Sequence, residues 1–127
     1  MTLRLTVPLL IAVVSAAPIV ARNRLTLAAE PAVAMAPANV VVRLTIDADA
    51  DNRAVEVVVD SPGFYRSSEI PLEGDRAPQK TIIEFRSLPA GDYDVGATLL
   101  GPGGHKRAFA HQEVRIMGVG RDGPEDR

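Results

Sequence analysis

Hydrophobic and polar residues alternate along most of the chain between residues 39 and 117, the pattern of β-strands that bury one face. The first such stretch sets four aliphatic residues on one side of a strand: Val40, Val42, Leu44 and Ile46. The alternation recurs and predicts six strands, over residues 40–46, 55–60, 64–72, 80–86, 93–99 and 107–117. Because no segment has the period of an amphipathic helix, we predict an all-β fold.

Turn-forming sequences separate these strands at intervals of about 8 to 12 residues, the spacing typical of a sandwich or barrel. Ser61–Pro62–Gly63 and the glycine-rich segment 101–104 each predict a chain reversal. The polar segments 47–53 and 73–79 are predicted to be loops. Pro71 interrupts the third strand, and because proline has no N–H we expect that strand at a sheet edge.

The segment from Leu88 to Val95 combines a hydrophobic anchor, a turn and the start of a strand. Leu88 precedes the turn Pro89–Ala90–Gly91, and Tyr93 follows Gly91 by two residues. This arrangement resembles the tyrosine corner of immunoglobulin-like sandwiches, in which the ring packs in the core and the hydroxyl bonds to nearby backbone. We therefore assign Leu88, Gly91 and Tyr93 to a structural corner.

With six strands, a possible seventh and this corner, residues 39–117 resemble a fibronectin type III or related bacterial immunoglobulin-like module. The chain contains no Trp, which many fibronectin-type domains keep in the second strand, so Val57 or Val59 has to fill that space. The resemblance implies an antiparallel β-sandwich. It also implies a spacer or a binding surface, because such modules are seldom enzymes.

Residues 1–21 have the pattern of a signal peptide. Arg4 precedes an uncharged apolar run from Leu5 to Val14, and small residues follow. The cleavage position stays open between Ala16, Ala21 and Ala29, and so does retention of the segment as an anchor. We expect a periplasmic or secreted protein whose mature form does not bind membranes.

The segments that flank the predicted sandwich differ from it in composition. Residues 22–38 are rich in Ala and Pro and are predicted to be a linker, although residues 25–27 also suit a short edge strand. Residues 118–127 are rich in Gly and Asp, and we expect a flexible tail there.

Charge and cysteine content exclude several classes of function. The chain of 127 residues has a formal net charge of −2 and no run of Lys or Arg, so nucleic acid is not an expected partner. The absence of Cys excludes disulfides and thiol catalysis. We expect no cofactor.

Asp47, Asp49 and Asp51 have the alternate spacing with which a calcium loop begins. The rest of the loop departs from that pattern, because Asn52 stands where glycine is needed and Val58 where a bidentate Glu is needed. We therefore expect a solvated hairpin loop and no bound metal. If a metal did bind, the three aspartates would be its candidate ligands.

His105 and His111 support an alternative function, that of a small periplasmic protein that binds a ligand or metal. They lie six positions apart along one predicted strand, at about 3.3 Å per residue, which argues against a preformed site.

The aromatic and basic run Phe64–Tyr65–Arg66 follows a predicted turn and has the composition of a binding hot spot. The alternative is that one ring packs in the core and the other covers the sheet edge. The chain has no G-x-S-x-G nucleophile motif, and we expect that it is not an enzyme. We predict a protein-binding or structural module of the cell envelope whose partner is another exported or envelope protein.

Overall fold

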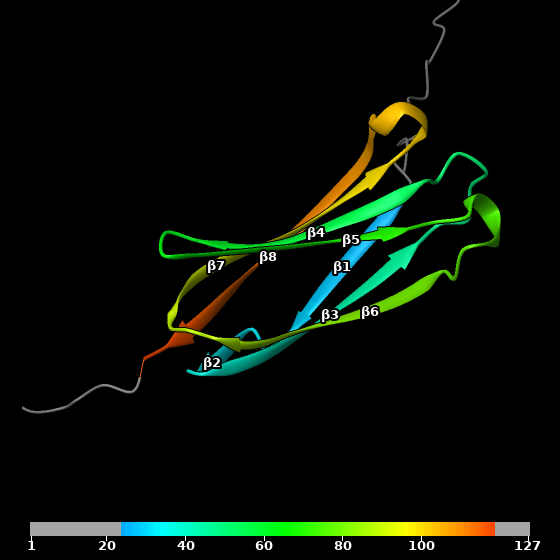
Figure 1. Ribbon diagram of the computed structural model, residues 1–127. Helices are drawn as coiled ribbons and strands as arrows, with labels where there is room; N and C mark the ends of the chain where they lie inside the picture. Colours follow the sequence, from blue (N-terminus) through cyan, green and yellow to red (C-terminus); the bar gives the residue numbers. More distant parts are fainter. Residues whose placement is uncertain (1–23, 119–127) are drawn as a thin grey trace, which may run out of the picture.

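Eight β-strands and two single-turn 3₁₀ helices account for most of residues 24–118, the part of the chain that the computed structural model describes (Figure 1). The strands are β1 (Leu25–Glu30), β2 (Val33–Met35), β3 (Ala38–Ile46), β4 (Ala54–Ser61), β5 (Phe64–Pro71), β6 (Lys80–Leu88), β7 (Gly91–Leu100) and β8 (Lys106–Met117). The helices η1 (Gly74–Arg76) and η2 (Pro102–Gly104) lie in loops. The all-β prediction is confirmed, and no helix within residues 24–118 is long and apolar enough to cross a membrane.

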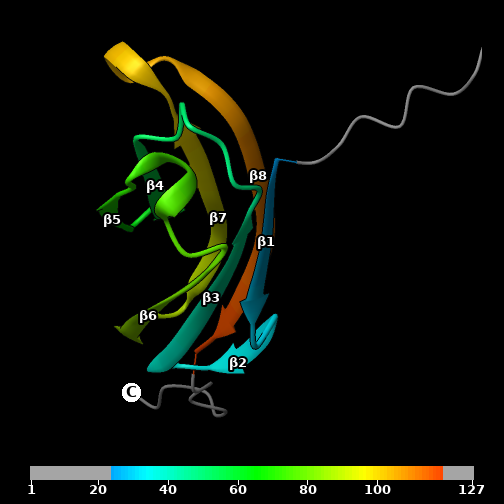
Figure 2. The same cartoon turned by 90° about the vertical axis from the view of Figure 1, so that its right-hand side faces the viewer.

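The strands form two sheets that pack face to face (Figures 1 and 2). One sheet has the order β1-β3-β6 and the other the order β2-β8-β7-β4-β5. Neighbouring strands are antiparallel except for β2 and β8, which are parallel. Hairpins join β4 to β5 and β7 to β8, whereas the other connections cross from one sheet to the other. The strand that contains Pro71, β5, lies at a sheet edge.

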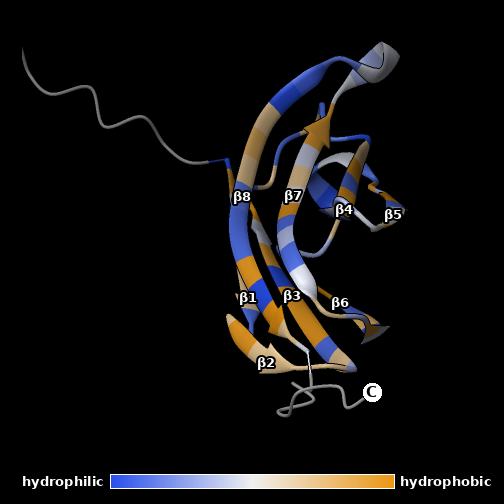
Figure 3. Cartoon of the chain, turned by 90° about the vertical axis from the view of Figure 1, so that its left-hand side faces the viewer, coloured by the Kyte–Doolittle hydropathy of each residue, from blue (hydrophilic) through white to orange (hydrophobic). Residues whose placement is uncertain are grey.

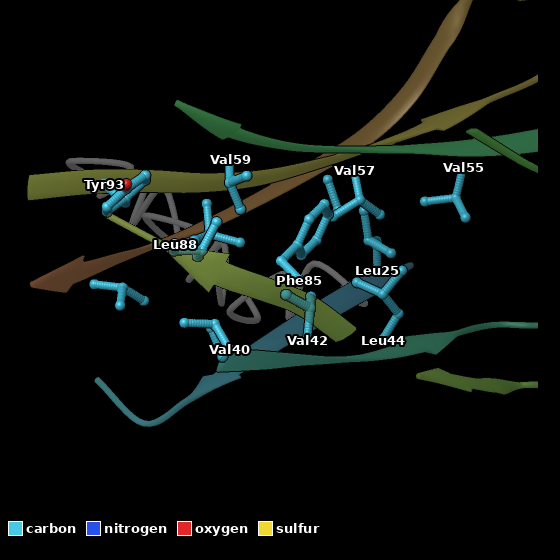
Figure 4. Close-up of a cluster of buried hydrophobic side chains, with 14 of the residues drawn as sticks. Leu25, Val40, Val42, Leu44, Val55, Val57, Val59, Phe85, Leu88 and Tyr93 are labelled. Carbon is cyan, nitrogen blue, oxygen red and sulfur yellow. The ribbon is translucent and has the colours of Figure 1, made fainter. Parts of the chain in front are cut away.

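Aliphatic side chains from both sheets fill the space between them. In Figure 4 the inward-facing valines of β4 point toward the inward-facing residues of β3. The β4 residues are Val55, Val57 and Val59, and the β3 residues are Val40, Val42 and Leu44. All six are fully buried or nearly so. The core is therefore built from β-branched and aliphatic residues without a Trp, and Val57 and Val59 lie within it.

The N-terminal boundary of the domain differs from the predicted one. β1, an edge strand that contains residues 25–27, pairs along its whole length with β3, and β2 pairs with β8. The sandwich therefore includes residues 25–35, of which the sequence suggested only 25–27 as a short edge strand and otherwise predicted a linker. Leu25 and Ala29 are buried in the core. An alanine-rich sequence is typical of a linker, yet the small side chain of alanine also fits where β1 passes close to the opposite sheet. Residues 1–23 and 119–127, which include the predicted signal peptide and most of the predicted tail, lie outside the described residues.

A single side chain, Gln112, ties the two sheets together where β1 passes β8. It belongs to the inward-facing set of β8, between Ala110 and Val114, and is half-buried. Its Nε2 donates to the carbonyl oxygen of Ala29 at 2.8 Å, and its Oε1 accepts from the Ala29 N–H at 2.9 Å. The side-chain amide thereby satisfies both backbone groups of Ala29, as a neighbouring strand would, on the edge of β1 that is not paired with β3.

Candidate interaction surface

The predicted hot spot at residues 64–66 is divided between the two faces of β5. Phe64 is half-buried, and its ring meets that of Tyr93 edge-on at a centroid distance of 6.0 Å. The Arg66 guanidinium lies 5.1 Å from the Phe64 ring centroid and donates to the carbonyl oxygen of Arg86 on β6 at 3.3 Å. Tyr65 points the other way and is 62% exposed. Phe64 thus packs against the core, Arg66 links β5 to β6 of the other sheet, and Tyr65 is left on the surface.

Tyr65 belongs to a continuous surface, the outer face of the five-stranded sheet. Strand pairing and alternation place on this outer face the residues Val33, Met35, Glu56, Val58, Asp60, Tyr65, Ser67, Glu69, Asp92, Asp94, Gly96, Thr98, Phe109, His111, Glu113, Arg115 and Met117. Figure 3 shows the alternation of hydrophilic and hydrophobic residues along β7 and β8 that sorts them between core and surface. The other strands of residues 24–118, those of the three-stranded sheet, pack against the opposite, inner face (Figures 1 and 2).

Most of the large hydrophobic side chains that residues 24–118 expose gather on the outer face. Six are exposed, and five of them are on it: Val33, Met35, Tyr65, Phe109 and Met117. The sixth, Ile82, lies on the three-stranded sheet. Apolar groups concentrated on one face of a monomer are typical of a binding surface.

The aromatic part of the outer face is built around Gly96. The Phe109 ring covers this glycine so closely that a Cβ at position 96 would lie 3.3 Å from Phe109 Cε2. The ring also stacks on His111, with centroids 5.7 Å apart and planes inclined by 22°. His111 in turn approaches Asp94, with Nδ1 and Oδ1 at 3.4 Å. These contacts hold Phe109 against the sheet while leaving it 62% exposed.

The outer face is also acidic. It carries one guanidinium, that of Arg115, against six carboxylates: Glu56, Asp60, Glu69, Asp92, Asp94 and Glu113. Several of them are direct cross-strand neighbours, because Asp94 is paired with Asp60 on one side and with Glu113 on the other. Like charges in such positions repel one another and destabilise a sheet.

A groove with a volume of about 770 Å³ crosses the acidic end of the outer face. Its rims are Ser61–Pro62 at the β4–β5 turn and Ala32–Val33 next to β8. Its floor is acidic and consists of Asp60, Asp92, Asp94, Glu113 and Arg115 together with neighbouring buried positions. We call this feature the acidic groove.

The predicted calcium-loop aspartates lie at another end of the sandwich and take part in a polar network. Asp49 Oδ1 accepts the Asp51 N–H at 2.8 Å, and its Oδ2 accepts from Arg107 Nη2 at 3.0 Å. Arg107 also donates to Asn52 Oδ1 at 2.7 Å, and Asn52 Nδ2 donates to the Asp47 carbonyl oxygen at 2.9 Å. The hydrogen bond from Arg107 lowers the pKa of Asp49, and the backbone bond from Asp51 adds to this effect.

The structure does not bring the candidate metal ligands together. Within residues 24–118 no three His, Cys, Asp or Glu side chains are grouped so that they could hold a metal ion. His105 Nδ1 lies 2.6 Å from the carbonyl oxygen of Pro102 in the β7–β8 loop, whereas His111 faces Asp94 on the outer face.

The corner residues lie at the β6–β7 connection. Leu88 is fully buried, and the Tyr93 ring is buried beside it (Figure 4). Tyr93 Oη donates to the Pro89 carbonyl oxygen at 2.7 Å, and burial raises the pKa of the phenol. Gly91 begins β7, where a Cβ would make only ordinary contacts with Ser61 and Tyr93. These contacts are structural and leave no functional group of the corner on the outer face.

Sequence reasoning found Tyr65 and missed the rest of the outer face. Phe109 and Val33 are apolar residues at positions where the alternation calls for solvent-facing side chains, and this was the available signal. The signal was weak for Val33, because β2 falls in the segment predicted to be a linker.

No protein-family model matches the sequence, and no curated protein matches it. Among solved structures, the fold is similar to that of a superoxide reductase (neelaredoxin) from Ignicoccus hospitalis, with a TM-score of 0.59 and 13% identity over 73% of this chain and 80% of that one. It is also similar to part of a family 76 glycoside hydrolase from a bovine Bacteroides thetaiotaomicron strain, with a TM-score of 0.50 and 13% identity. That match covers 71% of this chain and 19% of the hydrolase. At such identity the likeness shows the fold alone.

The first of these similarities corrects one expectation from the sequence. We expected that the chain is not an enzyme, because sandwich modules of the kind that it resembles seldom are. The fold is shared with a superoxide reductase, which is an enzyme, so that expectation is contradicted. Fold class by itself gives no reason to exclude catalysis.

Proposed function

We propose that this protein is a recognition module that binds another protein through the outer face of its five-stranded sheet. The observation that carries the proposal is the concentration of exposed hydrophobic side chains on that face, five of the six large ones within residues 24–118. Aromatic rings held in place against a sheet lose little conformational entropy when a partner covers them, which is why they are favoured at binding hot spots.

The geometry around Phe109 supports this proposal. The ring is fixed from below by Gly96 and from the side by His111, so it offers a pre-organised flat surface to a partner. Tyr65 presents a second ring on the edge strand β5. Val33 and Met35 lie on the opposite edge strand, β2, and the carboxylates of β4, β7 and β8 lie between the two edges, so a partner that covers the face would contact apolar and acidic groups together.

Site-specific photo-crosslinking tests the proposal. A photoreactive phenylalanine analogue is placed at Tyr65 or Phe109, and at Ile82 or Thr45 on the three-stranded sheet as matched exposed controls. We expect discrete adducts in the producing cells from the first pair only, identified by mass spectrometry. Absence of adducts at Tyr65 and Phe109, or the same adducts from the control positions, would reject the outer face as the binding surface.

We further propose that the sandwich is of the immunoglobulin-like, fibronectin type III-related kind. The hairpins between β4 and β5 and between β7 and β8, the sheet-crossing connections and the corner hydrogen bond of Tyr93 support this.

We also propose that the protein is exported, in keeping with the signal-peptide pattern of residues 1–21. N-terminal sequencing of the protein from envelope and culture-medium fractions tests this. We expect the mature protein to begin directly after Ala16 or Ala21, because cleavage after Ala29 would remove most of β1. A terminus at Met1 in the cytoplasmic fraction would contradict export.

A further inference from the structure

We infer that the acidic groove receives an extended Lys- or Arg-containing segment of the partner protein, an inference that rests on the proposed function and adds the chemistry of the partner. The groove crosses β4, β7 and β8 between the Ser61–Pro62 rim and the Ala32–Val33 rim. It is open along its length, so a peptide can lie in it without any strand having to move.

Two of the carboxylates on the floor of the groove, those of Asp60 and Glu113, have no cationic partner within residues 24–118. Asp60, Asp94 and Glu113 form one row across three adjacent strands. Arg115 binds Asp92, with Nε and Oδ1 at 3.0 Å, and His111 lies near Asp94. No basic side chain of residues 24–118 lies within ion-pair distance of Asp60 or Glu113.

The spacing of this row suits cationic side chains on an extended peptide. Adjacent strands are about 4.8 Å apart, and side chains on one side of an extended chain recur at about 6.6 Å. One cationic head can therefore lie between Asp60 and Asp94 and a second between Asp94 and Glu113. Each would relieve a like-charge contact that the sheet alone cannot relieve.

The surroundings of the row add an apolar contact. Tyr65, on β5, is the cross-strand neighbour of Asp60 and continues the same row. At the other end Val33, which is 58% exposed, lies next to Arg115 on the rim of the groove. An extended segment with two basic residues at alternate positions, and an apolar residue at the next alternate position on either side of them, would place its charges on the floor and its hydrophobic side chains on these two residues.

Other occupants fit the groove less well. Nucleic acid and anionic lipid would be repelled by the carboxylates. A divalent cation would need ligands grouped around one point, and residues 24–118 contain no such group of three. The sign and spacing of the charges thus favour a basic peptide.

The test is a titration of the ¹⁵N-labelled protein with the synthetic peptide Leu-Ser-Arg-Ser-Arg-Ser-Leu, followed by NMR. We expect saturable shift changes around Asp60, Asp94 and Glu113, with affinity that falls as salt rises. A peptide with glutamine in place of arginine should not bind. The double variant Asp94→Asn/Glu113→Gln should weaken binding about tenfold or more.

The matched control is Glu30→Gln/Glu84→Gln, which removes the same charge from exposed sites on the three-stranded sheet. Its affinity for the peptide should stay within about twofold of the original. Equal weakening by both double variants, shifts spread over β1, β3 and β6, binding of the glutamine peptide, or lack of saturation would overturn the inference.

The two proposals fail in different ways. If crosslinks from Tyr65 and Phe109 persist unchanged in the Asp94→Asn/Glu113→Gln protein, the outer face binds a partner but the groove does not take its basic segment. If the crosslinks are absent from the original protein, the proposed function itself fails.

Discussion

Replacing Gln112 by methionine removes the amide that joins β8 to β1 while keeping a side chain of similar length. The Gln112 amide makes two hydrogen bonds with the backbone of Ala29, a residue that is only 4% exposed. Methionine can neither donate nor accept there, so the Ala29 N–H and C=O would lose both bonds. The sheets would remain in apolar contact but without this link.

The cost of Gln112→Met follows from the number of groups left without a partner. Each hydrogen bond contributes about 0.5–1.5 kcal/mol, and a buried backbone group left unsatisfied costs about 1–3 kcal/mol, reduced where water can enter. We therefore expect the free energy of unfolding to fall by about 2–4 kcal/mol. For a domain of this size that corresponds to a Tm lower by on the order of 10–20 °C.

Urea unfolding followed by far-ultraviolet circular dichroism measures this change, and amide hydrogen exchange locates it. The Ala29 N–H should exchange faster in the Gln112→Met protein, whereas amides of β4 and β7 should change only through the global loss of stability. Glu113→Gln, at the next position but facing solvent, should stay within about 0.5 kcal/mol of the original.

Gln112→Glu separates the donor from the acceptor. The carboxylate can still accept from the Ala29 N–H, but at neutral pH it has no proton to donate to the Ala29 carbonyl oxygen and repels it. This variant should be destabilised at neutral pH, and its deficit relative to the original should shrink in acid, where the carboxyl group is protonated. A Gln112→Met protein within about 0.5 kcal/mol of the original, with Ala29 exchange unchanged, would refute the reasoning.

Three further changes test other contacts. Tyr93→Phe removes the hydrogen bond to Pro89 and should lower the free energy of unfolding by about 1 kcal/mol in the same urea assay; no change would mean that the corner bond is not stabilising. Because Arg107 lowers the pKa of Asp49 below its ordinary value of 3.8, this ion pair stabilises the fold above that pH and is lost as the pH falls through the lowered pKa. Asp49→Asn should therefore be less stable than the original near neutrality and lose less stability on acidification; parallel pH profiles would count against the pair. Asp94→Asn relieves repulsion across β4, β7 and β8 and should raise stability by a few tenths to about 1 kcal/mol at low salt, with a smaller gain at high salt; a loss at low salt would argue that the repulsion is already compensated.

The strands that could be predicted are those in which burial follows a strict alternation. Val40, Val42 and Leu44 face the core because β3 lies in the middle of its sheet with only one side covered, so solvent and core impose opposite demands on neighbouring residues. β1 was left ambiguous because only Leu25 and Leu27 mark its inward face clearly, and the third inward residue, Ala29, belongs to an alanine-rich stretch. Alanine contributes too little hydrophobic contrast to distinguish a strand from a linker.

The candidate surface could be predicted only in part. Tyr65 stood out because aromatic residues are scarce in this chain, at three Phe and two Tyr. Its neighbours in sequence, Phe64 and Arg66, lie on the opposite face of β5, whereas Phe109, on another strand of the same sheet, shares the face of Tyr65. Alternation along a strand places adjacent residues on opposite faces of the sheet, whereas strand pairing places residues that are distant in the sequence on the same face.

The amino-acid sequence by itself determined that this protein is all-β, where most strands begin and end, and which of their residues face the core. These are local properties, because side chains of a strand alternate with a period of two residues wherever the strand is placed. Tertiary structure decided which strands are neighbours: that Gln112 meets Ala29, and that Asp60, Asp94 and Glu113 form one acidic row. Pairing depends on how two sheets bury their apolar faces together, so the exposed residues that it aligns become a surface only in the folded chain.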